Sequence, residues 1–100
     1  MAISRLQGIA PTALSGTTPT SGAVVQGIAI MHVQGSFTGS VTLERSNDAG
    51  STYVPVANMS LTTPGAASFS EPCAGVLYRL TPNLSAGTPN GSVDGGVGLY

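Results

Sequence analysis

Glycine and proline recur so often in this chain that no stretch keeps an amphipathic helical pattern for more than one turn. The 100 residues include 14 glycines and 7 prolines. Between these breaks the chain is rich in valine, threonine and serine, which is typical of short strands joined by turns. A chain of this length is one domain. We therefore predict a single all-β domain.

The alternation of apolar and polar residues predicts about seven short antiparallel strands, packed as one β-sandwich of Ig-like or jelly-roll-like type. Val41 and Leu43 alternate with Thr42 and Glu44, so each pair faces one side of a strand. Residues 22–34 predict one long, well-covered central strand, with Gly27 at a bulge or close backbone approach. Residues 75–81 predict another strand, followed by a turn-rich link. A small barrel is the alternative, because periodicity does not separate the two.

The N-terminal part differs in composition from the rest. Residues 1–22 predict an N-terminal strand and a flexible arm, and residues 23–100 predict the β-sandwich domain. Within the first part, residues 10–22 have little to bury, so we expect an arm that becomes ordered on docking. On this hypothesis, deleting residues 1–20 leaves a folded core but weakens attachment to a partner.

Charge is sparse: only 7% of the residues are charged, against about 25% in ordinary domains. The formal net charge is -1 and there is no lysine, so nothing directs the protein toward nucleic acid or an acidic membrane. Serine and threonine supply 23 positions. A neutral, hydroxyl-rich surface lacks the usual defence against association and suits a protein docked against others.

Targeting signals and cysteines point to the compartment of synthesis. No apolar run reaches the roughly 18 residues of a transmembrane helix, and the N-terminus lacks the pattern of a signal peptide. The single cysteine, Cys73, excludes an internal disulfide framework and fits synthesis in a reducing compartment.

The run SNDAGSTY, Ser46 to Tyr53, matches the pattern S-x-D-x-G-x-T-aromatic. It resembles the Asp box of sialidases and other repeat-built glycosidases, in which the motif is a turn away from the catalytic centre. No period of 20 to 50 residues repeats here, as propeller blades require. We interpret the motif as a structural turn between two strands, made by Ser46, Asp48, Gly50, Thr52 and Tyr53. Asp48 accepts backbone hydrogen bonds, Gly50 supplies a positive φ, and Tyr53 covers the hairpin.

Residues with catalytic or metal-binding chemistry are few and scattered. His32 has no second ligand at metal-binding spacing, and Cys73 has no cationic neighbour that would activate it as a nucleophile. The four acidic residues form no paired-carboxylate site. We therefore predict no catalytic residues, no cofactor and no metal, and we expect no hydrolysis of sialosides.

Three charged residues are candidates for an interface: Arg5, Arg79 and Glu71. Arg79 lies in mid-strand on the face opposite Tyr78. It is a surface arginine, a partner of Glu71 or Glu44 across the sheet, or a donor to another subunit, and the sequence leaves these open. Glu44 and Arg45 point to opposite faces of one strand and do not pair with each other.

Two stretches, residues 35–56 and 71–88, resemble small β-sandwich virion proteins of tailed bacteriophages. The likeness covers about half of the chain. It departs from the family pattern at Ala49, where glycine is usual, and at Tyr53, where tryptophan is usual. The matching residues are Leu43, Arg45, Ser46, Asp48, Gly50, Thr52, Glu71, Pro72, Gly75, Tyr78, Arg79, Leu80, Gly87 and Thr88.

The resemblance implies a non-enzymatic structural protein of the virion, assembled in the cytoplasm of the bacterial host. A capsid cement or decoration protein that binds between capsid subunits is the first expectation. Its partners would be the major capsid protein or other virion subunits, in a homo-oligomer or a lattice, without nucleic acid or membrane. The alternative is a head or tail fibre component, or an adhesion module that binds host surface carbohydrate, although five aromatic residues and no tryptophan offer a thin platform for sugars.

Overall fold

The computed structural model describes residues 7–95, and this part of the chain is all-β, as predicted. Eight antiparallel strands replace the seven expected. They are β1 (Gln7–Ala13), β2 (Ala23–Val24), β3 (Gly27–Gln34), β4 (Phe37–Ser46), β5 (Val54–Leu61), β6 (Gly65–Glu71), β7 (Leu77–Gly87) and β8 (Asn90–Gly95). Residues 7–95 contain no helix long and apolar enough to cross a membrane.

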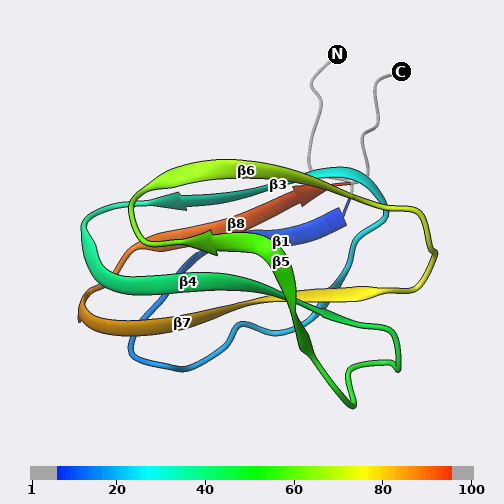
Figure 1. Cartoon of the computed structure of the whole chain (residues 1–100), viewed down its shortest axis with the longest axis horizontal. Helices are drawn as coiled ribbons and strands as arrows, with labels where there is room; N and C mark the ends of the chain where they lie inside the picture. Colours follow the sequence, from blue (N-terminus) through cyan, green and yellow to red (C-terminus); the bar gives the residue numbers. More distant parts are fainter. Residues whose placement is uncertain (1–6, 96–100) are drawn as a thin grey trace.

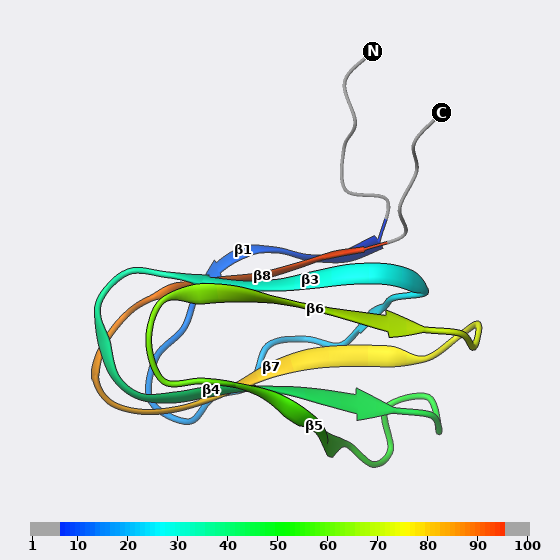
Figure 2. The same cartoon turned by 45° about the horizontal axis from the view of Figure 1, so that its top comes forward.

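The strands form two four-stranded sheets that pack face to face (Figures 1 and 2). Sheet A has the order β1-β8-β3-β6, and sheet B has the order β2-β7-β4-β5. The pairing is nested along the chain: β4 pairs with β5, β3 with β6, β2 with β7, and β1 with β8. One long hairpin is thus wound across two sheets, which is the jelly-roll form of the β-sandwich.

The core lies between the sheets and follows the alternation of the sequence. In β3, Met31 and Val33 are buried while His32 between them faces outward. Val41 and Leu43 of β4 are buried in the same way on sheet B. The buried apolar set is completed by Ile9, Leu14, Val25, Ala29, Met59, Val76, Tyr78, Leu80 and Val93.

The prediction of a single central strand over residues 22–34 is wrong. The segment is two strands in different sheets, because the chain leaves β2 in sheet B and crosses to β3 in sheet A. Gly27 adopts a φ of 84° just after the crossing, where an L side chain would be strained. The run is apolar throughout because part of it faces the core and part is an exposed apolar face. Ile28 is 62% exposed and Ile30 is 45% exposed.

The arm expected over residues 10–22 lies along the sandwich. Residues 10–13 complete β1, which pairs with β8. Leu14 is 2% exposed, and its N–H donates to the carbonyl of Pro89 at 2.8 Å. Further on, the N–H of Leu84 donates to the carbonyl of Gly16 at 2.9 Å.

The first part of the turn-rich link expected after Thr81 is instead the second half of β7, which ends at Gly87. A proline, Pro82, sits within this strand. The N–H groups of Leu80 and Leu84 both point toward the segment 16–20, one to the Thr20 hydroxyl and the other to the Gly16 carbonyl. The nitrogen of Pro82 shares their direction, away from β4, so its missing N–H removes no bond between β7 and β4.

Candidate functional site

Ser46 and Asp48 organise the turn between β4 and β5. The Ser46 hydroxyl, buried at the end of β4, donates to Asp48 Oδ1 at 2.7 Å and accepts from the Gly50 N–H at 2.9 Å. Asp48 Oδ1 also accepts from the Thr52 N–H at 2.9 Å. The hydrogen bond from Ser46, followed by that from Thr52, lowers the pKa of Asp48. These polar groups hold the turn closed and face one another rather than a ligand.

Tyr53 covers this turn and faces the N-terminal side of β2. A Cβ atom on Gly22 would lie 2.1 Å from the Tyr53 hydroxyl, so the tyrosine packs on bare backbone there. The Arg79 guanidinium stacks over the Tyr53 ring, with Cζ 4.0 Å from the ring centroid. Tyr53 therefore joins the turn to the outer face of sheet B.

Arg79 pairs with Glu44 across the sheet, one of the partners that the sequence left open. Its Nε lies 2.7 Å from Glu44 Oε1, and the Thr81 hydroxyl donates to the same oxygen at 2.6 Å. Burial tends to raise the pKa of Glu44, but the hydrogen bonds from Thr81 and Arg79 outweigh it and leave that pKa below its ordinary value. The charges of Arg79 and Glu44 on this face therefore bind each other within sheet B.

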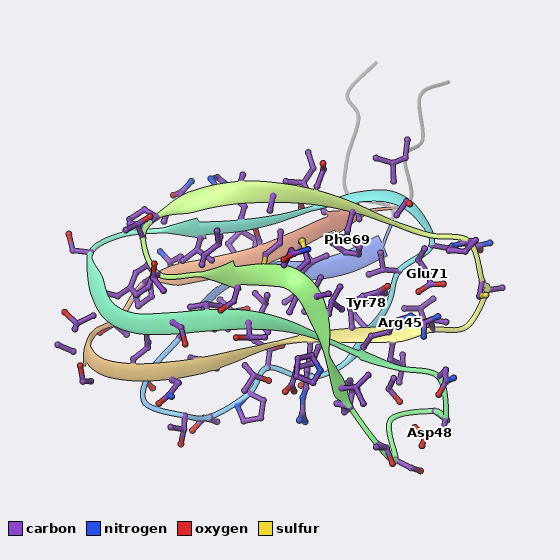
Figure 3. All side chains as sticks on the ribbon, in the orientation of Figure 1. Arg45, Asp48, Phe69, Glu71 and Tyr78 are labelled. Atoms are coloured by element: carbon purple, nitrogen blue, oxygen red, sulfur yellow. The ribbon has the colours of Figure 1, made fainter. Side chains whose placement is uncertain are left out.

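A second salt bridge among residues 7–95 joins the two sheets, between the buried Glu71 and the partly exposed Arg45 (Figure 3). Glu71, at the end of β6, is 2% exposed and accepts from Arg45 of β4 through both carboxylate oxygens, at 2.5 and 3.1 Å. The Tyr78 hydroxyl of β7 donates to Glu71 at 2.6 Å, and the Cys73 N–H donates at 3.0 Å. Phe69 packs on the Tyr78 ring with centroids 4.9 Å apart. We call Arg45, Glu71 and Tyr78 the inter-sheet clamp.

The clamp shifts the titration of its own members. The hydrogen bond from Arg45, with those from Tyr78 and the Cys73 N–H, outweighs burial and lowers the pKa of Glu71 to about 2. Burial, followed by the neighbouring carboxylate, raises the pKa of Tyr78 to about 12. At neutral pH Glu71 is ionised and Tyr78 is neutral, the states in which every contact of the clamp is made.

Sequence reasoning named Glu71 as a candidate for the interface and did not find its partner. Arg45 shares the face of Val41 and Leu43, so the alternation of β4 already directs it toward the core. An arginine directed toward the core indicates a buried acidic partner, and this signal in the sequence could have led to Glu71. Because the Glu71 carboxylate is buried and bound by Arg45 and Tyr78, its side chain takes no part in the docking face proposed under the function below. Arg5, the remaining candidate, lies outside the described residues.

Comparison with family models, with curated proteins and with solved structures finds no match. The surfaces of the sandwich itself therefore carry what can be inferred about function. Within residues 7–95, no group of three or more His, Cys, Asp or Glu side chains is placed to hold a metal ion. Cys73 is exposed, and His32 lies on the outer face of sheet A.

The outer face of sheet A is nearly uncharged. Among the described residues of its four strands, Asp94 is the one charged side chain on that face, since Glu71 points inward. Ile28 and Ile30 stand side by side along β3, next to Ser70 and Ser68 of β6 in the strand register. This surface, which we call the isoleucine face, combines exposed apolar side chains with hydroxyls.

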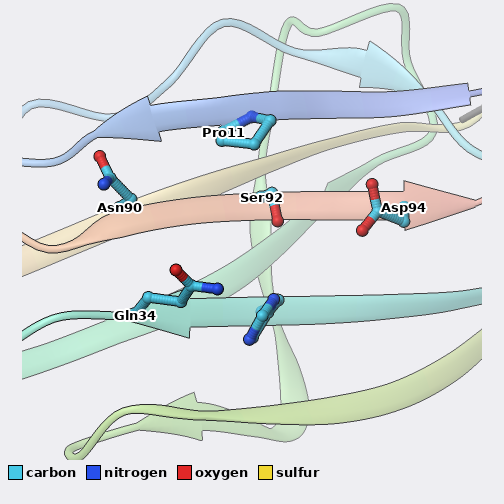
Figure 4. A pocket seen from close by; sticks show the side chains of 6 residues that line it. Pro11, Gln34, Asn90, Ser92 and Asp94 are labelled. Carbon is cyan, nitrogen blue, oxygen red and sulfur yellow. The ribbon is translucent and has the colours of Figure 1, made fainter.

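A shallow polar depression of about 170 Å³ lies on the same sheet (Figure 4). His32 faces Ser92 across β3 and β8, and Gln34 faces Asn90 in the next pair along. Pro11 of β1 and Asp94 of β8 complete the lining. Amide, hydroxyl and imidazole groups offer donors and acceptors together. Such a lining suits a small neutral ligand with several hydroxyls better than an anion, which Asp94 would repel.

Proposed function

We propose that this protein is a non-enzymatic structural protein of a bacteriophage virion, a cement or decoration protein that binds between capsid subunits. The observation that carries the proposal is the isoleucine face. It is a nearly uncharged sheet surface on which two large apolar side chains, Ile28 and Ile30, are exposed to solvent. An exposed apolar patch with a polar surround is typical of a protein–protein contact.

The use of charge elsewhere in the molecule supports the same proposal. Arg45 and Arg79 are engaged with Glu71 and Glu44, and Asp48 closes a turn. Docking would therefore depend on shape, apolar contact and hydroxyl hydrogen bonds, with little electrostatic steering. A protein that assembles into a dense lattice of neighbours needs contacts of this kind.

The resemblance to tailed-phage virion proteins supports the proposal at the level of fold. Arg45, Glu71 and Tyr78, which help carry the resemblance, form the inter-sheet clamp. Ser46, Asp48, Gly50 and Thr52 form the turn. These matching residues build the sandwich and leave the docking surface to other positions, so the resemblance and the isoleucine face are separate lines of support.

The test is binding of purified protein to particles of a phage whose genome encodes this chain. Replacing Ile28 with lysine should weaken binding by about tenfold or more, because burying an isoleucine is worth about 1.5–3 kcal/mol. Val54→Lys is the matched control, since Val54 is 53% exposed but lies on sheet B. Equal binding of both variants and the wild type would contradict the proposed face, and no binding by the wild type would contradict the cement function.

A second candidate, an adhesion module for host surface carbohydrate, is favoured by the polar depression around His32 and Ser92. Its volume is below the roughly 300 Å³ of pockets for drug-sized ligands, so it would take one ring of a longer glycan. On a glycan array, Gln34→Ala should abolish the signal of the wild type, whereas Asn83→Ala, an exposed amide on β7, should not. An array without hits for the wild type removes this candidate.

A further inference from the structure

The four edge strands differ in how well they resist pairing with another chain. β1 contains Pro11 and a register shift against β8. β5 contains Pro55 and a register shift against β4, and β2 is only two residues long. Prolines, irregularities and short length are the devices that protect sheet edges. β6 has none of them.

β6 is a regular edge of seven residues. It pairs with β3 without a register shift, from Val33 opposite Gly65 to Gly27 opposite Glu71. It contains no proline and no lysine, and its one charged residue, Glu71, is buried in the clamp. Its outward residues, Ala66, Ser68 and Ser70, are small and exposed. Such an edge presents unpaired backbone groups that are ready to receive another strand.

The side of the sandwich next to β6 is also incompletely covered. β1 and β2 contact each other at one side, where Ile9 and Leu14 are buried. β5 and β6 are the edges at the opposite side. Met59 of β5 is buried there, but four other apolar residues of these two strands are only partly buried: Val56, Leu61, Ala67 and Phe69. The unprotected edge of β6 and these partly exposed apolar side chains thus lie at the same side of the sandwich.

We propose that β6 pairs antiparallel with β6 of a second copy of this chain, about a two-fold axis at Ser68, which is the middle of the strand. In this register Ser68 faces its own copy, Ala67 faces Phe69, and Gly65 faces Glu71. No like charges meet, and the larger side chain of each of these unequal pairs faces a small one. A self-complementary contact of this kind is what a closed dimer requires.

The dimer would join the two A sheets into one continuous sheet of eight strands. The two-fold axis runs perpendicular to that sheet, so the isoleucine faces of both copies lie on the same side. The inference rests on the edges alone and does not need the proposed cement function. If both hold, the particle is engaged by two adjacent copies of the same face, which raises the effective concentration of the second contact.

Light scattering across a wide concentration range tests the dimer. The wild type should approach twice the monomer mass of 9.9 kDa. Ser68→Lys would place two lysines opposite each other at the axis and should weaken dimerisation at least tenfold. Ala10→Lys, an exposed position on the other edge of sheet A, is the control and should leave the mass unchanged. A wild type that stays monomeric, or a Ser68→Lys protein that still forms dimers like the wild type, overturns the proposal.

Cross-linking tests the register. In a Cys73→Ser background, Ser68→Cys should give covalent dimers with a short bis-maleimide, because directly opposed residues have Cβ atoms about 5 Å apart. Ala10→Cys in the same background should not. A dimer linked through residue 10 instead would overturn the assignment to β6. Particle binding that survives Ser68→Lys leaves the cement proposal standing, and loss of binding in Ile28→Lys with an intact dimer leaves the edge pairing standing.

Discussion

Two consecutive residues of the Asp-box turn, Ala49 and Gly50, have positive φ values of 60° and 90°. Glycine accepts this conformation without cost, whereas alanine pays roughly 1 kcal/mol or more for it. Ala49, one of the two positions at which the chain departs from the pattern of the virion proteins it resembles, is therefore the strained residue of the turn. The hydrogen bonds of Ser46 and Asp48 hold it there.

Replacing Ala49 with glycine should stabilise the protein by about 1 kcal/mol, because the strain is removed. The free energy of unfolding in urea, followed by circular dichroism, measures this. The control is Ala57→Gly on β5, where alanine has no positive φ, and it should lower the free energy of unfolding by about 0.5–1 kcal/mol. The same sign of change in both variants would contradict the assignment of strain to Ala49.

The clamp predicts a loss of stability in acid. Glu71 has a pKa of about 2 in the folded protein against 4.5 as its ordinary value. A carboxyl with a lowered folded pKa contributes stability above its unfolded value, and loses that contribution as the pH falls from 4.5 toward 2. The full contribution is about 3 kcal/mol. Urea unfolding at a series of pH values should show the decline within that window.

Glu71→Gln should remove most of this pH dependence. The variant keeps the shape of the side chain but leaves Arg45 without its counter-charge, so it should be less stable at neutral pH and approach the wild type near pH 2. Glu44 and Asp48, whose pKa values are also lowered, leave a smaller slope of the same sign. A wild type equally stable at pH 3 and pH 6 would contradict the role of the clamp.

Among the elements, β4 and the first half of β7 follow from sequence because one face of each is buried and the other is polar. The sequence does not separate β2 from β3, because the chain crosses between the sheets in two residues, Val25 and Gln26, and one polar residue is too short a break to mark a strand end. The second half of β7 is not predictable from the sequence, since Pro82 and the glycines locally favour a turn. Its strand conformation depends on pairing with β4, which is distant in the sequence. The turn residues were predictable from local spacing. The clamp joins three strands, and its partners depend on how the sheets face each other.

The segment that follows β1 belongs to the core, and Leu14 tests this. Leu14→Ala should cost about 3 kcal/mol, because a buried leucine is replaced by a cavity beside Leu80 and Gly91. Thr17→Ala, at an exposed position of the same segment, should change the stability by less than about 0.5 kcal/mol. A Leu14→Ala protein as stable as the wild type would instead support the expectation that residues 10–22 are an arm outside the core. The deletion of residues 1–20 removes β1 and Leu14 together, so unfolding is its expected result.

For the whole molecule, the nested pairing makes nearly every strand contact a distant one in sequence. The closure of β1 on β8 brings together residues that stand at opposite ends of the described chain. Folding that depends on such contacts is slow, in the range of milliseconds to seconds. Stopped-flow refolding, followed by tyrosine fluorescence, should give rates in that range. Refolding within microseconds would contradict a transition state that contains the nested pairs.

The pairing of Gln7 with Gly95 has a practical consequence. Two paired residues of an antiparallel ladder are about 5 Å apart, so Gln7 and Gly95 are separated by one strand spacing. If a surface loop of another protein were cut, its two ends could be joined to these two positions without being pulled apart. The sandwich is therefore built as a cassette, which could be carried within a larger polypeptide while the host keeps its own shape.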